Sequence, residues 1–257
     1  MKSNRIKNLE EYILKHESVS LDHLCEVFSI SKNTLRRDIN ELAKKGTIKK
    51  VYGGVEASET SKKNLNNLIS FEERNIKNNN EKIRIAKFAA SFVEDGDIIF
   101  IDSGTTTLHI IEFLKDRKDV TILTNNINAI VNALPSPNLN VICLGGNLIR
   151  KTNSFEGIHN FTTFKDYNIN KAFMAATGVS ILNGATNSSP LEYEIKKSIV
   201  NKSDEVYLLV NSSKFNVSAL MTYCSLKEID HFITDSEPPK EYVEYFNENN
   251  IKFTVAE

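Results

Sequence analysis

The sequence predicts two domains, a small N-terminal winged helix-turn-helix and a larger C-terminal Rossmann-like, mostly parallel α/β domain. Three observations predict this class. Residues 1–56 carry three short amphipathic helical patterns followed by a basic, hairpin-like run. From residue 80 onward, short apolar runs alternate with helical patterns, which is typical of parallel strands covered on both faces. A polar stretch separates the two parts.

Composition indicates an ordinary globular protein, with 257 residues, 40% apolar and 25% charged. Cys25, Cys143 and Cys224 lie far apart, without a Cys-x-x-Cys pair or a His cluster at metal-ligand spacing. We therefore expect buried, reduced thiols and neither a metal nor a cofactor. The N-terminus lacks an apolar signal-peptide core, and no stretch approaches a membrane span. These features predict a cytoplasmic protein without a membrane partner.

The net charge of −1 conceals an asymmetry along the chain. The first 55 residues hold 11 of the 32 basic and 7 of the 33 acidic residues, a net charge of +4. The remaining 21 basic and 26 acidic residues leave the rest of the chain at −5, which a polyanion repels. Only the N-terminal segment is therefore a candidate face for nucleic acid.

Helical spacing of apolar residues predicts three helices in this segment. The first covers residues 6–13 and the second residues 21–28, where apolar residues recur at i, i+3, i+4 and i+7. The third begins after the N-cap Ser31 and ends at Gly46, which suits the left-handed position that follows a helix. The turn between the second and third helices is very short.

The third helix has the composition of a DNA recognition helix. With Leu35, Ile39 and Leu42 against the core, its opposite face is basic and rich in amides. Such side chains bond guanine and adenine edges in the major groove, which a recognition helix enters with its N-terminal residues. The expected DNA-contacting residues of this helix are Ser31, Lys32, Asn33, Thr34, Arg36 and Arg37, with Asn33 and Arg37 on bases.

Residues 47–52 alternate as a strand, and we expect Gly53-Gly54 to supply the positive φ of a hairpin turn. This hairpin resembles a basic wing, with Lys49 and Lys50 beside phosphates and Tyr52 packed or bonded to a phosphate. The alternative is a three-helix bundle whose charges are only its solvated face. The order of helix, tight turn, basic helix and basic hairpin favours DNA binding.

Residues 57–70 are polar and form the expected linker, so the winged helix-turn-helix covers residues 1–56 and the α/β domain residues 71–257. The α/β domain should open with a well-buried helix over residues 80–93. The apolar runs that predict its strands are 98–101, 120–123, 141–144, 172–176, 206–210 and 231–234.

Small and polar residues follow most of these runs, at the strand ends where open α/β sheets bind ligands. The loop after the first run leads into an expected helix over residues 108–114, whose free N–H groups attract anions. Gly104 would let a phosphate approach, the hydroxyls of Ser103, Thr105 and Thr106 would donate, and Lys214 would add charge. The alternative is an N-capped turn without a ligand, since the loop matches no known phosphate fingerprint.

Two further features have open interpretations. Gly145-Gly146 either lines the ligand site or only turns the chain. Glu192 and Glu194 precede Lys196 and Lys197 on a predicted helix, where they form a solvated, ion-paired face or contact a sugar hydroxyl.

The chain resembles the DeoR family of sugar-metabolism repressors along almost its whole length. The most specific match is Ser31–Ile39 followed by Tyr52-Gly53-Gly54, which resembles the family's helix-turn-helix signature. Four motifs resemble those of the family's effector domain: Asp102–Thr106, Thr124-Asn125, Leu144-Gly145-Gly146 and Ser213-Lys214-Phe215.

The resemblance implies an effector domain similar in fold to ribose-5-phosphate isomerase, with a sugar phosphate held by the Ser-Gly-Thr-Thr loop. It also implies a homo-oligomeric repressor that releases operator double-stranded DNA when the sugar phosphate binds. The implied ligand set is Asp102, Ser103, Gly104, Thr105, Thr106, Asn125, Gly145, Gly146 and Lys214. Asn211 departs from the aspartate usual in the family, so a relative's inducer cannot be transferred.

Two other functions compete with this one. An isomerase-like enzyme would need a positioned base, for which Asp102, Glu192 and Asp235 are candidates. Alternatively, the protein binds DNA while its C-terminal domain only oligomerises or senses another kind of ligand. We expect a regulator and not an enzyme, because the polar strand ends predict a ligand site while nothing places a base beside a substrate carbon.

Overall fold

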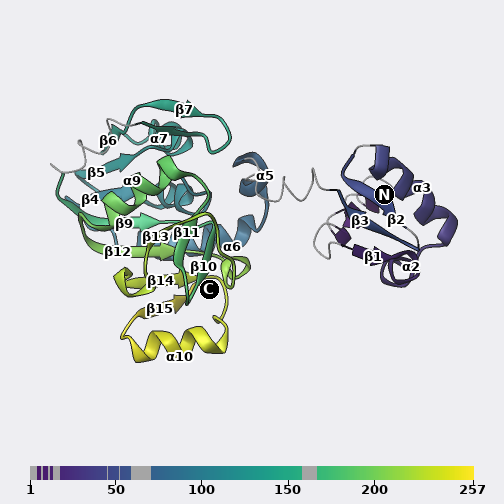
Figure 1. The fold of residues 1–257 in the computed structure, drawn as a ribbon. Coiled ribbons are helices and arrows are strands. Elements are labelled where there is room, and N and C mark those ends of the chain that lie inside the picture. Colours follow the sequence, from purple (N-terminus) through teal and green to yellow (C-terminus); the bar gives the residue numbers. More distant parts are fainter. Residues whose placement is uncertain are drawn as a thin grey trace. The chain divides into compact units, whose positions relative to one another are not determined.

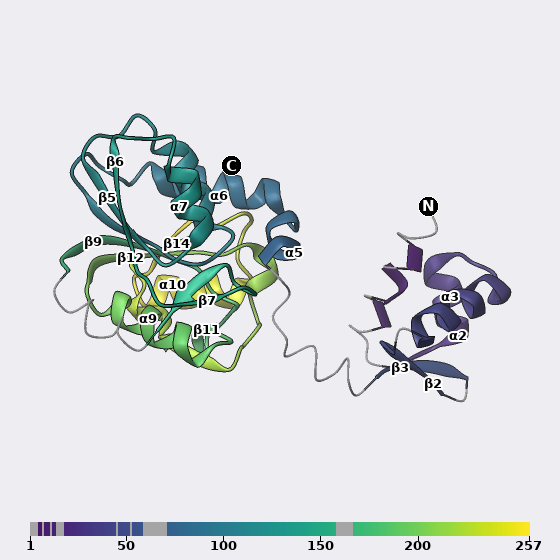
Figure 2. The ribbon, with the colours of Figure 1, turned by 90° about the horizontal axis from the view of Figure 1, so that it is seen from above.

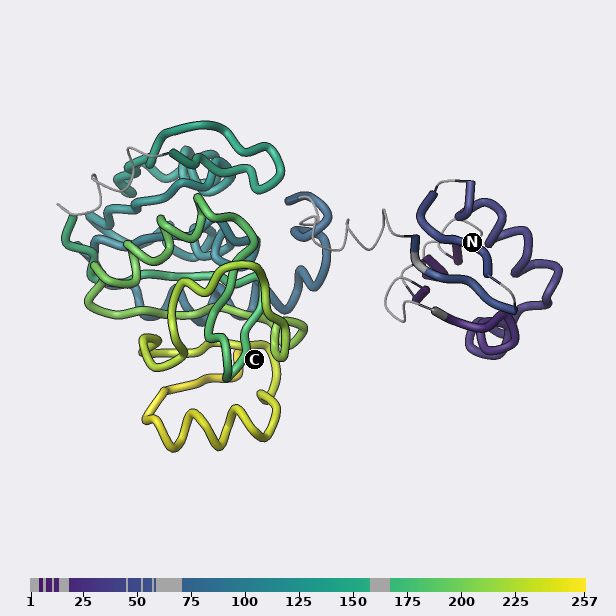
Figure 3. Tube along the Cα trace, in the orientation of Figure 1, coloured from purple at the N-terminus to yellow at the C-terminus, as the bar shows by residue number. Residues whose placement is uncertain are grey.

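The computed structural model describes residues 5, 6, 8–10, 12, 13, 18–44, 46–51, 53–58, 71–157 and 167–257. The chain divides into two compact units, Met1–Leu68 and Ile69–Glu257 (Figure 1). Figure 3 traces the chain from the purple first unit to the yellow C-terminal helix of the second.

The first unit has the elements of a winged helix-turn-helix. Residues 5, 6, 8–10, 12 and 13 are helical. They are followed by β1 (Ser18–Ser20), α2 (Leu21–Phe28), α3 (Lys32–Lys44), β2 (Ile48–Val51) and β3 (Gly54–Ala57). The strands form an antiparallel sheet in the order β1-β3-β2. The three predicted helices and the hairpin are confirmed, whereas β1 was not predicted because three residues are too few to show a period.

Local capping explains where these helices begin and end. The Ser20 hydroxyl caps α2 by accepting from the His23 N–H at 3.3 Å, and Ser31 accepts from Thr34 N–H at 3.4 Å at the start of α3. The turn after α2 places Ser29 in the left-handed region, and Gly46, at φ +77°, ends α3 as predicted.

Glycine is needed at the two positions of the wing turn, 53 and 54, for different structural reasons. Gly53 has a φ of +74°, as the predicted turn requires, but Gly54 does not have a positive φ. A Cβ on Gly54 would lie 2.7 Å from the carbonyl oxygen of Val19, so this glycine permits the close approach of β1. Pairing continues to Ala57, and the Ser58 N–H donates to the Thr47 carbonyl. The sheet therefore includes the first residue of the expected linker.

The second unit is built on seven parallel strands in the order β15-β14-β12-β9-β4-β5-β6. Their bounds are β4 Ile98–Ile101, β5 Val120–Thr124, β6 Leu139–Cys143, β9 Ile169–Met174, β12 Ser203–Leu209, β14 His231–Thr234 and β15 Lys252–Val255. All six predicted apolar runs are strands. β15 was not predicted, because this edge strand is only partly buried and lacks a continuous apolar run.

Helices cover both faces of this sheet, as Figure 2 shows with α6 and α7 on one side and α9 and α10 on the other. Along β4, Ile99 and Ile101 belong to one core and Phe100 to the other. The helices are α5 Phe71–Ile76, α6 Asn79–Ala90, α7 Ile127–Ala133, α9 Pro190–Val200 and α10 Lys240–Glu248, with 3₁₀ segments η1 Thr107–Phe113, η3 Ser212–Lys214 and η4 Leu226–Glu228. The expected α-helix over 108–114 is thus a 3₁₀ helix, and the first long helix ends at Ala90 instead of residue 93.

Short strands add two smaller sheets that the sequence did not predict. β10 (Gly178–Ser180), β11 (Gly184–Asn187) and β13 (Met221–Cys224) form an antiparallel sheet. β7 (Asn147–Ile149) and β8 (Ser154–Glu156) form a hairpin. Strands of three or four residues carry too little periodicity to be recognised.

The cysteines differ from the expectation that all three are buried. All three are free thiols, but Cys143 is exposed, Cys25 is partly exposed and only Cys224 is buried. In the described residues, no helix is both long and apolar enough for a membrane span. Likewise, none of the described His, Cys, Asp and Glu side chains form a group that could hold a metal ion.

Candidate functional site

The predicted DNA face of the first unit is exposed. Leu35, Ile39 and Leu42 are buried, as the helical pattern required, and the opposite face of α3 projects into solvent. The exposed predicted contacts are Ser31, Lys32, Asn33, Arg36, Arg37, Lys49 and Lys50, while Thr34 is partly buried. Tyr52 lies outside the described residues.

Contacts join this face into one surface. The Lys50 ammonium donates to the Asn40 side-chain oxygen, which connects the wing to α3. Lys32 forms an exposed ion pair with Asp22 at 2.6 Å. Arg37 and Lys49 take part in no ion pair among the described residues, so both cations are available to an approaching polyanion.

One charged residue of α3 faces the core. Asp38 is only 1% exposed, and both of its carboxylate oxygens accept from Arg5, at 2.8 and 3.2 Å. This fork-like contact ties the N-terminal helical residues to α3, and its hydrogen bonds raise the pKa of Arg5. Sequence reasoning missed this pair, although a charge three residues after Leu35 on the apolar stripe was the signal that could have revealed it.

The second unit places its polar loops at a topological switch point. Strand order reverses between β4 and β9, which are adjacent, so the loops after these two strands diverge. Ligands of open α/β sheets bind in the space that such diverging loops leave. Asp102–Thr106 follows β4 at this point, and Ala175 follows β9.

Asp102 bridges the two diverging loops. Its carboxylate accepts from the Ser103 N–H and the Ala175 N–H, both at 2.8 Å, and forms an ion pair with Lys196. Asp102 is 1% exposed. These contacts on both oxygens show that Asp102 positions the loop, while its direct contact with a ligand stays a prediction.

The loop after β4 offers backbone donors. Thr107 donates its hydroxyl to the carbonyl oxygens of Asp102 and Gly104, at 2.8 and 3.0 Å, which closes the loop on itself. A Cβ on Gly104 would lie 2.3 Å from the Ala175 Cβ, so glycine is required for this packing. Within the described part of the chain, the N–H groups of Gly104, Thr105 and Thr106 donate no hydrogen bond. Successive backbone N–H groups without a partner are donors that an anion can use.

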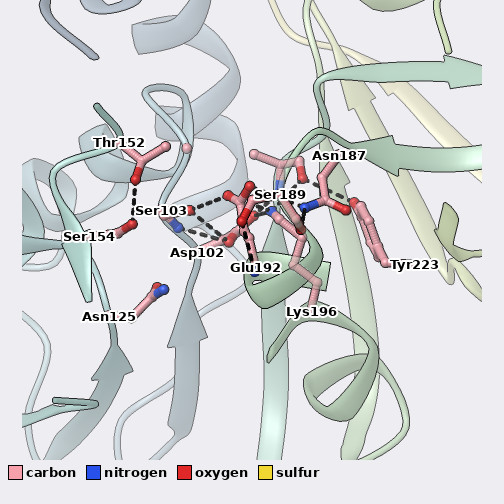
Figure 4. A network of polar contacts seen from close by, with 12 residues as sticks. Asp102, Ser103, Asn125, Thr152, Ser154, Asn187, Ser189, Glu192, Lys196 and Tyr223 are labelled. Atoms are coloured by element: carbon pink, nitrogen blue, oxygen red, sulfur yellow. Dashed lines mark hydrogen bonds and ion pairs between the residues drawn. The ribbon is translucent and has the colours of Figure 1, made fainter. Parts of the chain in front are cut away.

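A buried carboxylate from α9 reaches this loop (Figure 4). Glu192 accepts from the Ser103 hydroxyl at 2.7 Å and from the Asn187 amide at 3.2 Å. Burial alone would raise the pKa of Glu192, but the charge of Lys196 and these hydrogen bonds outweigh burial and lower it. The Ser103 hydroxyl, expected to donate to a phosphate, is therefore already donating to Glu192.

Lys196 completes this network. Besides Asp102, it bonds the Ala175 carbonyl at 2.9 Å and lies 3.8 Å from Glu192. Its side chain is 3% exposed, and it lies over the Tyr223 ring. The interpretation of α9 as a solvated, ion-paired face is thus wrong for Glu192 and Lys196, because α9 packs these side chains against the sheet; Glu194 and Lys197 are exposed as expected.

Three cations gather near the same loops. Arg74 on α5, Lys82 on α6 and Lys214 on η3 each have a lowered pKa, with burial as the largest cause. The pKa of Lys82 falls to about 8, because burial is reinforced by the positive charges of Lys214 and Arg74. Two nitrogens of the Arg74 guanidinium, Nε and Nη2, are buried without a hydrogen-bond partner. Sequence reasoning identified only Lys214 of these three.

The other expected ligand residues have mixed environments. Asn125 is buried and donates its amide to the Phe155 carbonyl at 3.1 Å. Gly145 and Gly146 are exposed, and a Cβ on Gly146 would lie 2.6 Å from the carbonyl oxygen of Glu156, so Gly146 allows the β7–β8 hairpin to fold. Asn211 is buried and accepts from the Ser213 hydroxyl at 2.8 Å, a contact within its own loop.

Comparison with known protein families matches both units. Residues 5–61 match the DeoR-like helix-turn-helix domain, and residues 77–236 match the DeoR C-terminal sensor domain.

Several curated proteins are similar over nearly their whole length. The HTH-type transcriptional regulator IolR of Bacillus subtilis is 49% identical over 256 residues, which cover 100% of both chains. The glycerol-3-phosphate regulon repressor of Escherichia coli is 26% identical, covering 99% of each chain. The putative aga operon transcriptional repressor of Escherichia coli O157:H7 is 25% identical, covering 94% of this chain and 89% of its own.

Solved structures are more distant. Ribose 5-phosphate isomerase A from Methanocaldococcus jannaschii reaches a TM-score of 0.40 at 20% identity, covering 54% of this chain and 55% of its own. The β subunit of eIF2B from Chaetomium thermophilum reaches a TM-score of 0.44 at 14% identity, covering 60% and 48%.

Proposed function

This chain is a member of the DeoR family of DNA-binding transcriptional regulators, and we propose that it represses a sugar-catabolic operon and releases its operator when a phosphorylated sugar binds. The helix-turn-helix places exposed amide and basic side chains on one face of α3. The sensor domain collects polar loops at a switch point. The repressors named above for a glycerol-3-phosphate regulon and for the aga operon support a link to sugar metabolism.

The observation that carries the phosphate assignment is the cluster of Arg74, Lys82 and Lys214. Arg74 and Lys214 are half-buried and Lys82 is buried, with its ammonium donating to the Arg74 carbonyl. Burying a cation is costly unless an anion compensates it, and among the described residues none of the three has a carboxylate within ion-pair distance. A phosphate group carries up to two negative charges and several acceptor oxygens, so it can satisfy several such donors at once. The free N–H groups of residues 104–106 would bind the same group.

We propose a binding role and not a catalytic role for the sensor domain. Each carboxylate considered as a base is already engaged: Asp102 by two N–H groups and Lys196, and Glu192 by Ser103 and Asn187. Asp235 accepts from the Ser212 N–H at 2.6 Å and from its hydroxyl at 3.2 Å. A general base must instead hydrogen-bond the proton that it abstracts, whereas these carboxylates are held by contacts within the protein.

On the DNA side, we propose that Asn33 and Arg37 contact bases, while the other exposed side chains of α3 and the wing contact phosphates. A homo-oligomer would present two such helices to paired operator half-sites, since two-fold protein symmetry matches a palindromic operator.

An electrophoretic mobility shift tests this function. The full chain is titrated onto the DNA upstream of its own gene at fixed salt, with a panel of sugar phosphates, the same sugars without phosphate, and inorganic phosphate. We expect a specific complex that one or more sugar phosphates release and that unphosphorylated sugars leave intact.

Two variants make the result specific. Lys214→Met should bind DNA normally but resist release, whereas Lys240→Met, an exposed lysine of α10, should behave as wild type. A complex that no phosphorylated sugar releases would contradict the sensor assignment and favour a domain that only oligomerises or senses another ligand. Turnover of a sugar phosphate above the uncatalysed rate would favour the enzyme instead.

A further inference from the structure

Two buried asparagines of the sensor domain have acceptor atoms without a donor. Asn125 and Asn187 are each 1% exposed, and the side-chain oxygen of each lacks a hydrogen-bond partner. Their amide nitrogens are fixed: Asn125 donates to the Phe155 carbonyl, and Asn187 donates to the Ser189 carbonyl at 2.8 Å and to Glu192. Since acceptors hold both nitrogens, each amide has a defined orientation and its oxygen is the open atom.

A third acceptor lies next to Asn187. Glu156 on β8 is 2% exposed, and its only donor among the described residues is the Ser189 hydroxyl, at 3.2 and 3.5 Å from its two oxygens. A carboxylate can accept about four hydrogen bonds, so most of its capacity is unused. Burial, reinforced by the charge of Glu192, raises the pKa of Glu156. The Ser189 hydroxyl that contacts Glu156 also caps α9 by accepting from the Glu192 N–H. This cap fixes the position of the hydroxyl relative to Asn187.

These acceptors differ in kind from the cation cluster. Arg74, Lys82 and Lys214 offer donors, which a phosphate group matches, but a phosphate dianion has no hydrogen to donate to Asn125, Asn187 or Glu156. A hydroxyl group supplies one donor and fits an open amide or carboxylate oxygen. Figure 4 draws Asn125 on one side of Ser103 and Asn187 on the other. Glu156 is linked to Asn187 through Ser189, whose carbonyl accepts from the Asn187 amide and whose hydroxyl donates to the Glu156 carboxylate.

We propose that Asn125, Asn187 and Glu156 form a hydroxyl-recognition subsite, which binds the hydroxyl groups of a polyhydroxylated carbon chain and selects among phosphorylated ligands. This inference rests on the proposed function, because the cation cluster must hold the anionic end of the same ligand. In the subsite, each open acceptor pairs with one hydroxyl of the ligand. An analogue that lacks this hydroxyl leaves a buried acceptor without a partner and therefore binds more weakly. Selectivity therefore resides in these acceptors and general anion affinity in the cations.

Isothermal titration calorimetry of the full chain separates the two contributions. The probes are inorganic phosphate, a series of pentose 5-phosphates and hexose 6-phosphates, and the deoxy analogues of whichever sugar phosphate binds most tightly. We expect that sugar phosphate to bind wild-type protein at least tenfold more tightly than inorganic phosphate. Asn125→Ala and Asn187→Ala should each reduce this preference about tenfold and leave the Kd for inorganic phosphate within twofold.

The matched control is Asn170→Ala, because Asn170 lies at the opposite end of β9 and accepts from the Ile98 N–H at 2.9 Å. This variant should lose about as much thermal stability as Asn125→Ala and Asn187→Ala, but its preference for the sugar phosphate over inorganic phosphate should not change. Glu156→Gln, which keeps the side-chain shape, is a second independent test and should also reduce the preference.

An unchanged preference in Asn125→Ala, Asn187→Ala and Glu156→Gln overturns the subsite, while binding of inorganic phosphate leaves the proposed function standing. The subsite is also overturned if sugar phosphates bind the wild-type protein no more tightly than inorganic phosphate does. If no phosphorylated compound binds wild-type protein, both the subsite and the proposed function fail. A deoxy analogue that binds wild type and one asparagine variant equally well identifies which hydroxyl that asparagine contacts.

Discussion

The basic residues of the two units differ in their exposure to water. Arg37 and Lys49 of the helix-turn-helix are exposed, whereas Lys82 of the sensor domain is 5% exposed. An exposed cation keeps its hydration and acts on a polyanion mainly by releasing counterions, so many such residues each contribute a little. A buried cation loses its hydration and must be compensated by hydrogen-bond acceptors and an anion that fit beside it. The same residue types therefore serve a long polymer in one unit and a compact ligand in the other.

In each unit a buried carboxylate with a cationic partner ties distant segments together. Asp38 holds Arg5 in the first unit, and Asp102 holds Lys196 in the second. Arg5 remains one-third exposed, whereas the Lys196 side chain is 3% exposed. The pair in the sensor domain should therefore be far more sensitive to the loss of one partner.

The largest expected effect is on stability, from Asp102→Ala. This substitution leaves Lys196 buried without its counter-ion and frees two N–H donors, so unfolding free energy should fall by about 3–5 kcal/mol. Chemical denaturation monitored by circular dichroism measures the change. Glu244→Ala, which removes an exposed ion pair with Lys240 on α10, should change stability by less than about 0.5 kcal/mol. Equal effects in both variants would show that burial does not distinguish the two pairs.

Next in size is the loss of effector response on removing Arg74, a half-buried cation whose Nε and Nη2 atoms are buried. Arg74→Met should weaken sugar-phosphate binding by about 2 kcal/mol, roughly thirtyfold, because charge-assisted hydrogen bonds from its open nitrogens are lost. Operator affinity should not change. Calorimetry and the mobility shift give the two values, and Arg84→Met, which changes an exposed arginine of α6, is the matched control. Weakened DNA binding with unchanged ligand affinity would contradict the assignment.

On the exposed side of the comparison, Arg37→Ala should cost about 1–3 kcal/mol in operator binding and much less in binding to random DNA. The reason is that a base contact is lost only on the correct sequence. Fluorescence anisotropy with operator and scrambled duplexes measures both affinities. Lys44→Ala, on the same face but in the last turn of α3, should affect both duplexes alike. Equal losses for Arg37→Ala on both duplexes would assign Arg37 to phosphate contacts.

The lowered pKa of Lys82 predicts opposite pH effects on ligand binding and on stability. With a pKa of about 8 in the folded protein, Lys82 is mostly charged at pH 7 and mostly neutral at pH 9, so sugar-phosphate affinity should fall about tenfold between them. The ligand-free protein should gain stability as pH rises from about 8 toward 10.5, because in this window the unfolded state binds more protons.

Calorimetry at pH 7 and 9 and thermal melting over the same range check both signs. In Lys82→Met the pH dependence of both quantities should become smaller. If affinity were independent of pH in wild-type protein, the charge of Lys82 would have no part in ligand binding.

The smallest expected effect belongs to the wing. Lys49→Ala should weaken operator and random DNA equally, by a few-fold, and reduce the slope of log affinity against log salt by about 1. Affinities measured at several salt concentrations provide the slope. An unchanged slope would place Lys49 away from the phosphates.

By itself, the sequence determined the class of the protein and most of its elements. Helical and strand periods are local, so they located α2, α3 and six strands of the central sheet, together with the exposed face of α3. Composition and charge assigned nucleic-acid binding to the first unit alone. The short or edge strands, such as β1 and β15, and the short helix α5 were missed, because they bury too few side chains to show a pattern.

Only the tertiary structure decided which polar side chains meet around the loop after β4, where we propose the effector site. Asp102 and Lys196 are 94 residues apart in the chain, and Ser103 and Glu192 are 89 apart, so nothing in their local sequence shows that they meet. Arg74 and Lys82 have the local pattern of ordinary surface cations, and Asn187 lies on a strand too short to recognise. Whether a polar side chain is solvated or buried depends on which distant segments pack over it. In this protein, that packing distinguishes the side chains proposed to bind a ligand from ordinary surface charges.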